Sequence, residues 1–146
     1  GDDKLSFNAE LFLFLADRAL HYDTIVKQGR ENGVVMSDRG FLSGVAYACA
    51  NHPEVDQAFL LLLNRFALEG NYPDKIVLFL TNEKLLKERL SSKTHDAIES
   101  RGSEYLLKIQ AIMQAILGHL GIEYIQVDAA LSKEEIYTII EEFIYG

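Results

Sequence analysis

Residues 75–80 restrict the fold more than any other part of the sequence. Five consecutive apolar residues follow Lys75, and the loop-type residues 70–74 stand directly before it. A short apolar run bounded by turn residues is typical of a strand buried on both faces of a parallel sheet. Parallel strands need long crossover connections, usually helices. The rest of the chain is therefore expected to alternate between helices and strands.

The pattern does alternate along the chain, which indicates an α/β fold. Strands are predicted at 33–38, 75–80 and 123–127. Helices are predicted at 8–28, 41–49, 53–68, 82–90 and 103–120, and from the capping box Ser132-Lys133-Glu134-Glu135 onward. Pro53 is expected at the first position of its helix, and the polar residues 91–102 are expected to be mobile. Without repeats or linkers, residues 1–146 are expected to form a single domain. Its opening helix suggests that a first βαβ unit is absent.

Composition narrows the possible functions. The chain has 146 residues, with 14 Lys and Arg against 22 Asp and Glu, so its formal net charge is −8. An acidic surface argues against nucleic-acid binding, although a few local arginines could hold a small phosphorylated ligand. The apolar runs 11–16 and 58–63 are too short to cross a membrane. A single cysteine, Cys49, and the lack of a leader pattern favour a cytoplasmic protein.

The first candidate site lies on the helix predicted at 8–28. At about 100° per residue, Phe14 and Arg18 lie one turn apart at the edge of a polar arc formed by Glu10, Asp17, His21, Thr24 and Gln28. Such a pair could form a pocket wall on which a base stacks while the guanidinium hydrogen-bonds its edge. The alternative is a surface phenylalanine covered by the arginine stem or packed under a loop.

The second candidate site is Ser37-Asp38-Arg39, at the carboxyl end of the strand predicted at 33–38. Ligands of open α/β sheets bind at such strand ends, and the start of the next helix favours anions. Arg39 could therefore bind phosphate, while Asp38 could hold a magnesium ion through water. Alternatively, Asp38 caps the helix that begins at Phe41 and Arg39 pairs with a surface carboxylate.

Other motifs are weaker or missing. The basic residues Arg89, Lys93 and Arg101 form either a solvated stretch or a lid over phosphates. The four histidines show no metal-ligand spacing. No glycine is followed by lysine, so the phosphate-binding loop G-x-x-x-x-G-K-[ST] is not in these residues, and neither is G-x-G-x-x-G.

Together these blocks resemble the thymidylate kinase family, P-loop enzymes that phosphorylate dTMP with ATP. F-L-A-D-R-A at 14–19 is similar to the family's base-binding helix, and S-D-R-G-F-L-S-G-V-A-Y at 37–47 to its D-R-[YF]-x-x-S-x-x-A-[YF] block. P-D-K-I-V-L-F-L at 73–80 is similar to the strand that leads to the lid. D-A-I-E at 96–99 with E-Y-L at 104–106 is similar to the lid and the next helix, and V-D-A at 127–129 to the end of the last strand.

The resemblance implies a three-layer P-loop kinase fold with a parallel sheet, truncated before its first βαβ unit and with a lid at about 91–102. It also implies a homodimer, with dTMP and ATP as substrates and Mg²⁺ as cofactor. The implied roles are thymine stacking by Phe14, thymine hydrogen bonding by Arg18, phosphate binding by Arg39, a place at the magnesium and phosphoryl-transfer centre for Asp38, and contacts with the nucleoside by Ser43 and Tyr47.

Two departures from the family pattern shape the expected activity. The P-loop segment is not in these residues, and Ala97 stands where family lids usually carry arginine, so the lid charge would fall to Arg89, Lys93 or Arg101. We expect the 146 residues to keep much of a dTMP pocket without appreciable kinase activity. The alternatives are a noncatalytic nucleotide-binding or dimerisation module, and another deoxynucleotide kinase.

Overall fold

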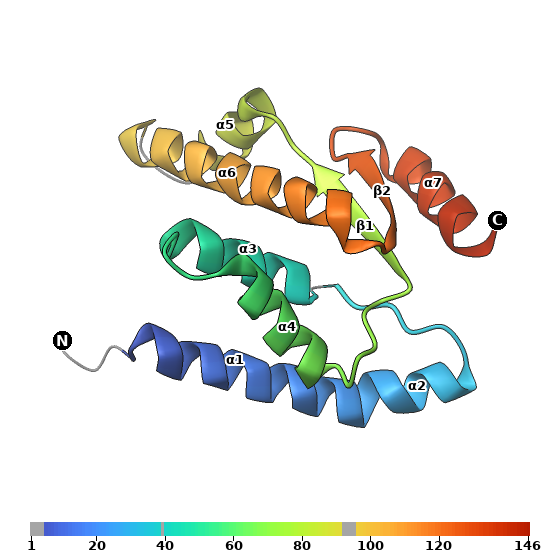
Figure 1. The fold of residues 1–146 in the computed structure, drawn as a ribbon. Coiled ribbons are helices and arrows are strands. Elements are labelled where there is room, and N and C mark those ends of the chain that lie inside the picture. The colour runs from blue at the N-terminus through green and yellow to red at the C-terminus, as the bar shows by residue number, and fades with distance from the viewer. Residues whose placement is uncertain (1–4, 39, 92–95) are drawn as a thin grey trace. The chain divides into compact units, whose positions relative to one another are not determined.

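The computed structural model describes residues 5–38, 40–91 and 96–146, with all their side chains except those of residues 87, 89–91 and 96–101. The chain divides into two compact units, residues 1–72 and 73–146, and each has its own elements (Figure 1). The expectation that the whole chain forms one domain stays a prediction.

A long helix opens the first unit. α1 (Phe7–His21), η1 (Tyr22–Val26) and α2 (Lys27–Asn32) follow one another without a break (Figure 1). The helix predicted at 8–28 is thus confirmed and extends further. Ser6 caps its start by accepting a hydrogen bond from the Ala9 amide at 3.2 Å. η1 is a single π-helical turn, in which the Lys27 amide donates to the carbonyl of Tyr22, five residues earlier.

The strand predicted at 33–38 is wrong. These residues are described and form no strand, and Val34 and Met36 are exposed. Apolar and β-branched residues favour a strand only where a neighbouring strand supplies hydrogen bonds and packing. The described residues of the first unit contain no strand that could do so.

Two shorter helices complete the first unit. α3 (Phe41–Asn51) confirms the helix predicted at 41–49, and α4 (Gln57–Ala67) begins four residues later than predicted. The placement of Pro53 at the first helical position is therefore wrong. α4 begins at Gln57 because the side chain of Asp56 accepts from the Ala58 amide at 3.0 Å and caps the helix. Pro53 instead lies in a turn closed by the Val55 amide on the His52 carbonyl.

The second unit holds the parallel sheet. β1 (Lys75–Leu80) and β2 (Glu123–Asp128) pair in parallel, with Lys75 opposite Glu123 and Leu80 opposite Asp128. Both strands were predicted, and an α/β chain with a parallel sheet is confirmed. Gln114 of α6 (Asp96–Leu120) contacts Gln126 on one face, and Lys75, on the other face, contacts α7 (Lys133–Tyr145). The two helices therefore cover opposite faces (Figure 1).

The boundaries of the remaining helices test the other predictions. α5 (Glu83–Ser91) confirms the helix predicted at 82–90, and the capping box that opens α7 at Ser132 is present. α6 starts at Asp96, seven residues before the predicted start. Residues 96–102 form about the first two turns of α6. They are mostly polar, and their apolar residues do not recur at helical spacing, so the pattern did not indicate a helix. Part of the predicted lid, residues 92–95, lies outside the described residues.

Candidate functional site

Two of the predicted site residues meet at one backbone carbonyl. The guanidinium of Arg18, in α1, donates to the carbonyl oxygen of Gly40 at 3.3 Å, and the hydroxyl of Ser43, in α3, donates to the same oxygen at 3.3 Å. Gly40 is the N-cap residue of α3. The carbonyl therefore joins the predicted base-binding helix to the start of the helix that follows Asp38 and Arg39.

Phe14 and Arg18 form a row on α1, one turn apart. Phe14 is 66% exposed, so the alternative that it packs under a loop is wrong. Arg18 is half-buried, and this burial lowers the pKa of its guanidinium, with the charge of Asp17 partly opposing the effect. A guanidinium has five N–H donors, so the bond to Gly40 leaves donors that can reach a ligand.

Ser43 and Tyr47 form the matching row on α3. The buried face of this helix consists of Phe41, Leu42, Val45 and Ala46, and Ser43 and Tyr47 lie off that face. Tyr47 is 40% exposed, so it is not an ordinary core tyrosine. The rows on α1 and α3 both start beside the Gly40 carbonyl and present an aromatic ring one turn away from it.

Asp38 is exposed and makes no hydrogen bond or ion pair with the described residues. The alternative that it caps α3 is wrong, because the N-cap is Gly40 and no side chain bonds to the first amides of the helix. An exposed carboxylate could be a ligand of Mg²⁺, which prefers oxygen ligands. Arg39 lies outside the described residues, so its role as phosphate ligand stays a prediction.

Gly40 departs from the aromatic residue that the D-R-[YF]-x-x-S block has at this position. The backbone does not demand glycine there. Its φ of −118° is open to any residue, and an added Cβ would meet nothing within 4 Å. The carbonyl that receives Arg18 and Ser43 would be present with any residue, so the substitution leaves the observed bonds intact.

The predicted lid cations cannot be placed in the site. Lys93 and the side chains of Arg89 and Arg101 lie outside the described part of the chain, and their assignment stays a prediction. Within the described part, no three side chains of the metal-binding types gather. No helix described is both long and apolar enough to cross a membrane.

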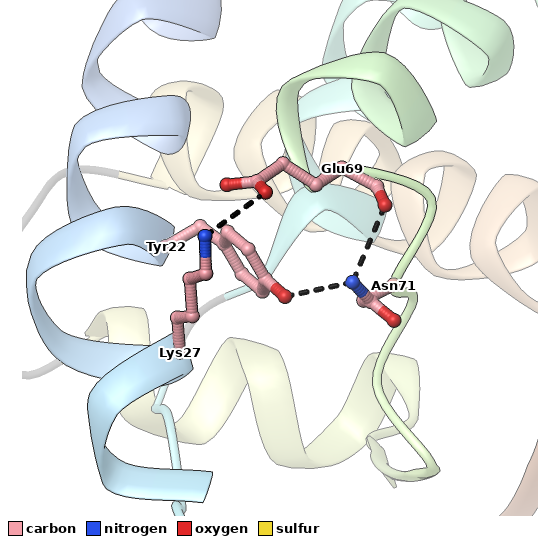
Figure 2. A network of polar contacts seen from close by, with 4 residues as sticks. All are labelled: Tyr22, Lys27, Glu69 and Asn71. Carbon is pink, nitrogen blue, oxygen red and sulfur yellow. Dashed lines mark hydrogen bonds and ion pairs between the residues drawn. The ribbon is translucent and has the colours of Figure 1, made fainter. Parts of the chain in front are cut away.

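Sequence reasoning missed the acceptor that organises the site. A backbone carbonyl carries no residue-type signal, and the contact between residues 18 and 40 exists only once α1 and α3 are folded together. It also missed the polar network that Tyr22, Lys27, Glu69 and Asn71 form beside these rows (Figure 2). The π-helical turn that places Tyr22 and Lys27 has no signature in the apolar pattern.

Comparisons with known proteins match nearly the whole chain. The family model described as thymidylate kinase matches residues 2–140. The thymidylate kinase of Campylobacter curvus (strain 525.92) is 49% identical over 145 residues, covering 99% of this chain and 74% of the relative. That of Sulfurovum sp. (strain NBC37-1) is 46% identical, covering 98% and 74%, and that of Helicobacter hepaticus (strain ATCC 51449 / 3B1) is 43% identical, covering 96% and 69%.

Proposed function

This chain belongs to the thymidylate kinase family, and we propose that its residues bind dTMP for phosphorylation by ATP to dTDP. The observation that carries the proposal is the convergence of Arg18 and Ser43 on the Gly40 carbonyl. This contact brings the helix predicted to bind the base next to the loop predicted to bind the phosphate. One nucleoside monophosphate can contact both the base-binding helix and the phosphate-binding loop only if the two lie within the length of that ligand.

Each candidate side chain has a part in this reaction that its chemistry allows. Phe14 offers an exposed ring for stacking on thymine, and Arg18 has free donors for the edge of the base. Ser43 and Tyr47 face the nucleoside, and Arg39 binds its phosphate. These contacts hold the acceptor oxygen in place, which is the main task in phosphoryl transfer.

Asp38 is the residue that would hold the magnesium ion, directly or through water. When bound, Mg²⁺ neutralises charge on the transferring phosphates. Arg89, Lys93 and Arg101 are candidates for the lid that closes over them. We also propose a homodimer, because α1 exposes an apolar stripe opposite its packed face. A cytoplasmic location is proposed because the single cysteine, Cys49, suits a reducing compartment.

Two measurements on the purified 146-residue chain test the proposal. Calorimetry is expected to show dTMP binding that Arg39→Ala weakens by about 1.5–3 kcal/mol, because a charge-assisted bond to phosphate is lost. A coupled ADP-release assay is expected to show no appreciable turnover, since the sequence contains no G-x-x-x-x-G-K-[ST]. Turnover in the ordinary kinase range of ~1–100 per second would contradict the second expectation, and absence of dTMP binding the first.

The 146 residues contain no G-x-x-x-x-G-K-[ST], so by themselves they also suit a second candidate function. A noncatalytic nucleotide-binding or dimerisation module would use the same rows on α1 and α3 without transferring phosphate. The two candidates differ when a phosphate-binding loop is supplied. Turnover of dTMP by a longer form that carries G-x-x-x-x-G-K-[ST] before these residues supports the kinase, and binding without turnover in that form supports the module.

A further inference from the structure

The π-helical turn η1 allows two side chains of one helix to reach the same loop. In an α-helix, residues five apart point about 140° away from each other at 100° per residue. Bonding from residue i to i+5, as between Tyr22 and Lys27, brings such residues nearly into line. Tyr22 and Lys27 accordingly both contact the loop that follows α4 (Figure 2).

The contacts of this latch, formed by Tyr22, Lys27, Glu69 and Asn71, are specific. The side-chain amide of Asn71 donates to the Tyr22 hydroxyl at 2.7 Å and to the Glu69 carbonyl at 3.2 Å, and the Lys27 ammonium pairs with the Glu69 carboxylate at 3.2 Å. Tyr22 is 4% exposed, whereas the ion pair is half-exposed. Exposed ion pairs contribute little, so the Tyr22–Asn71 bond is the part that fixes position.

The loop on the far side of the latch has an unusual backbone. Glu69 has φ of +54° and Gly70 has φ of +81°. A left-handed conformation is uncommon for glutamate, so this residue must be held by its surroundings. The Asn71 side chain bonds to the carbonyl of Glu69 and Lys27 bonds to its carboxylate. The loop is thus a defined anchor for the helix.

The latch lies directly beside the candidate site. Phe14, Arg18 and Tyr22 follow one another at intervals of four, so they form one row on α1. Exposure falls along the row from Phe14 through the half-buried Arg18 to the buried Tyr22. Tyr22, at the buried end of the row, bonds to the loop after α4. Arg18, in the middle, bonds to Gly40, and Phe14 is at the exposed end.

We propose that Tyr22, held by Asn71 across the π turn, is a positioning residue that sets the rotation of α1 and thereby the place of Arg18 and Phe14 in the dTMP pocket. The inference rests on the proposed function for its ligand. Without the hydroxyl bond, the π turn can relax toward α-helix. One residue of register corresponds to about 100° of rotation, which moves Arg18 relative to the Gly40 carbonyl.

The test compares Tyr22→Phe with a matched control, Tyr72→Phe, in the 146-residue chain. Both variants keep the ring and lose one hydrogen bond within the first unit, since the Tyr72 hydroxyl donates to the Leu61 carbonyl at 3.0 Å. Tyr22→Phe is expected to raise the Kd for dTMP about three- to tenfold, the range for one neutral hydrogen bond. Tyr72→Phe is expected to leave that Kd unchanged. It should lower the unfolding midpoint by about as much as Tyr22→Phe does, because each variant loses one hydrogen bond. Equal weakening of dTMP binding in both variants, or none in Tyr22→Phe, would overturn the proposal.

A second readout does not depend on dTMP. The Phe41 amide belongs to the peptide group that contains the Gly40 carbonyl, so its ¹⁵N chemical shift reports the bonds from Arg18 and Ser43. The shift is expected to change in Tyr22→Phe. Tyr72→Phe is not the control for this readout, because the Tyr72 ring stacks on the Phe41 ring at 4.7 Å between centroids. If the wild-type chain binds no dTMP, the proposed function fails, and this shift decides the positioning role alone: a change supports it, and an unchanged shift overturns it.

Discussion

At the residue scale, an exposed aromatic ring next to an anchored arginine is the feature that most directly suggests a base-binding surface. The Arg18 guanidinium gives up one donor to Gly40 and is held in place by it, while Phe14 has no such restraint. A fixed arginine loses less side-chain entropy when it binds a ligand. We therefore expect Arg18 to orient the bound base and Phe14 to supply most of the contact area with it.

Phe14→Ala tests whether the ring stacks on thymine. The variant is expected to weaken dTMP binding by about 0.5–1.5 kcal/mol, the range for aromatic pairs. Its stability should change by less than ~0.5 kcal/mol, because the ring is mostly exposed. Titration calorimetry measures the first quantity and urea unfolding the second. Phe66→Ala is the control, since Phe66 is 84% exposed on α4 and lies outside the site. Equal dTMP affinity in Phe14→Ala and wild type would make Phe14 an ordinary surface residue.

Tyr47 is predicted to select the sugar. It lies one turn after Ser43, and a bulky ring packed against deoxyribose would leave neither room nor a partner for a 2′-hydroxyl. Rejection of this kind is steric and is relaxed by a smaller side chain. Tyr47→Ala is therefore expected to raise the affinity for ribo-TMP relative to dTMP, even if both affinities fall.

The measurement for Tyr47 is the ratio of the two Kd values in wild type and variant, and in an active form the ratio of kcat/KM. Tyr47→Phe is the control, since it keeps the ring and should keep the ratio. Because Tyr47 is not part of the buried face of α3, stability should change little. An unchanged ratio in Tyr47→Ala would remove this residue from the sugar site.

At the element scale, the helices and strands that were predicted correctly are those whose own residues carry the signal for them. β1 was predicted because five apolar residues stand together after Lys75, and β2 because Tyr124, Ile125 and Val127 form a short run of strand-favouring residues after Gly121. α7 was predicted because its capping box lies in four adjacent residues. The strand expected at 33–38 failed because a strand depends on a partner that its own residues do not encode. The π turn and the Gly40 acceptor were missed for the same reason, since both are set by contacts with distant residues.

Tyr72, in the loop that follows α4, provides a prediction about the stability of the chain at alkaline pH. Burial raises the pKa of Tyr72 above its usual 10.0, with the positive charge of Arg65 partly opposing. The folded chain therefore binds the phenolic proton more tightly than the unfolded chain does. The resulting stabilisation is complete below pH ~10 and is lost as pH rises through the native pKa.

Tyr72→Phe is expected to reduce the stability of the chain at pH 8 by about 0.5–1.5 kcal/mol, through the lost bond to the Leu61 carbonyl. It should also make the decline above pH 10 shallower than in wild type. Urea unfolding of both proteins between pH 8 and 11 measures the difference, in which the other tyrosines and lysines cancel. Parallel curves for the two proteins would show that Tyr72 ionisation is not linked to folding.

At the scale of the whole molecule, α1 exposes more apolar surface than a monomer needs. An apolar stripe runs along the helix, away from the row that carries Arg18 and Tyr22. It consists of Phe12, Leu13 and Leu20, with Ala9 and Ala16 between them. Small residues among large ones allow a second helix to approach closely. Burial of such a patch stabilises association by roughly 25 cal/mol per Å² before the costs of association.

We therefore expect the chain to form a homodimer through this stripe. Light scattering at micromolar concentration should give twice the 16.5 kDa of one chain. Leu20→Glu places a charge in the stripe, where its desolvation would oppose pairing, and should give the mass of one chain. Tyr137→Glu is the control, because Tyr137 is at least as exposed as Leu20 but lies on α7, outside the stripe. Its variant should stay dimeric. A wild-type mass of 16.5 kDa would contradict the dimer. A dimeric Leu20→Glu would instead move the interface away from α1, and Phe59, Leu62 and Phe66 of α4 would become the next surface to test.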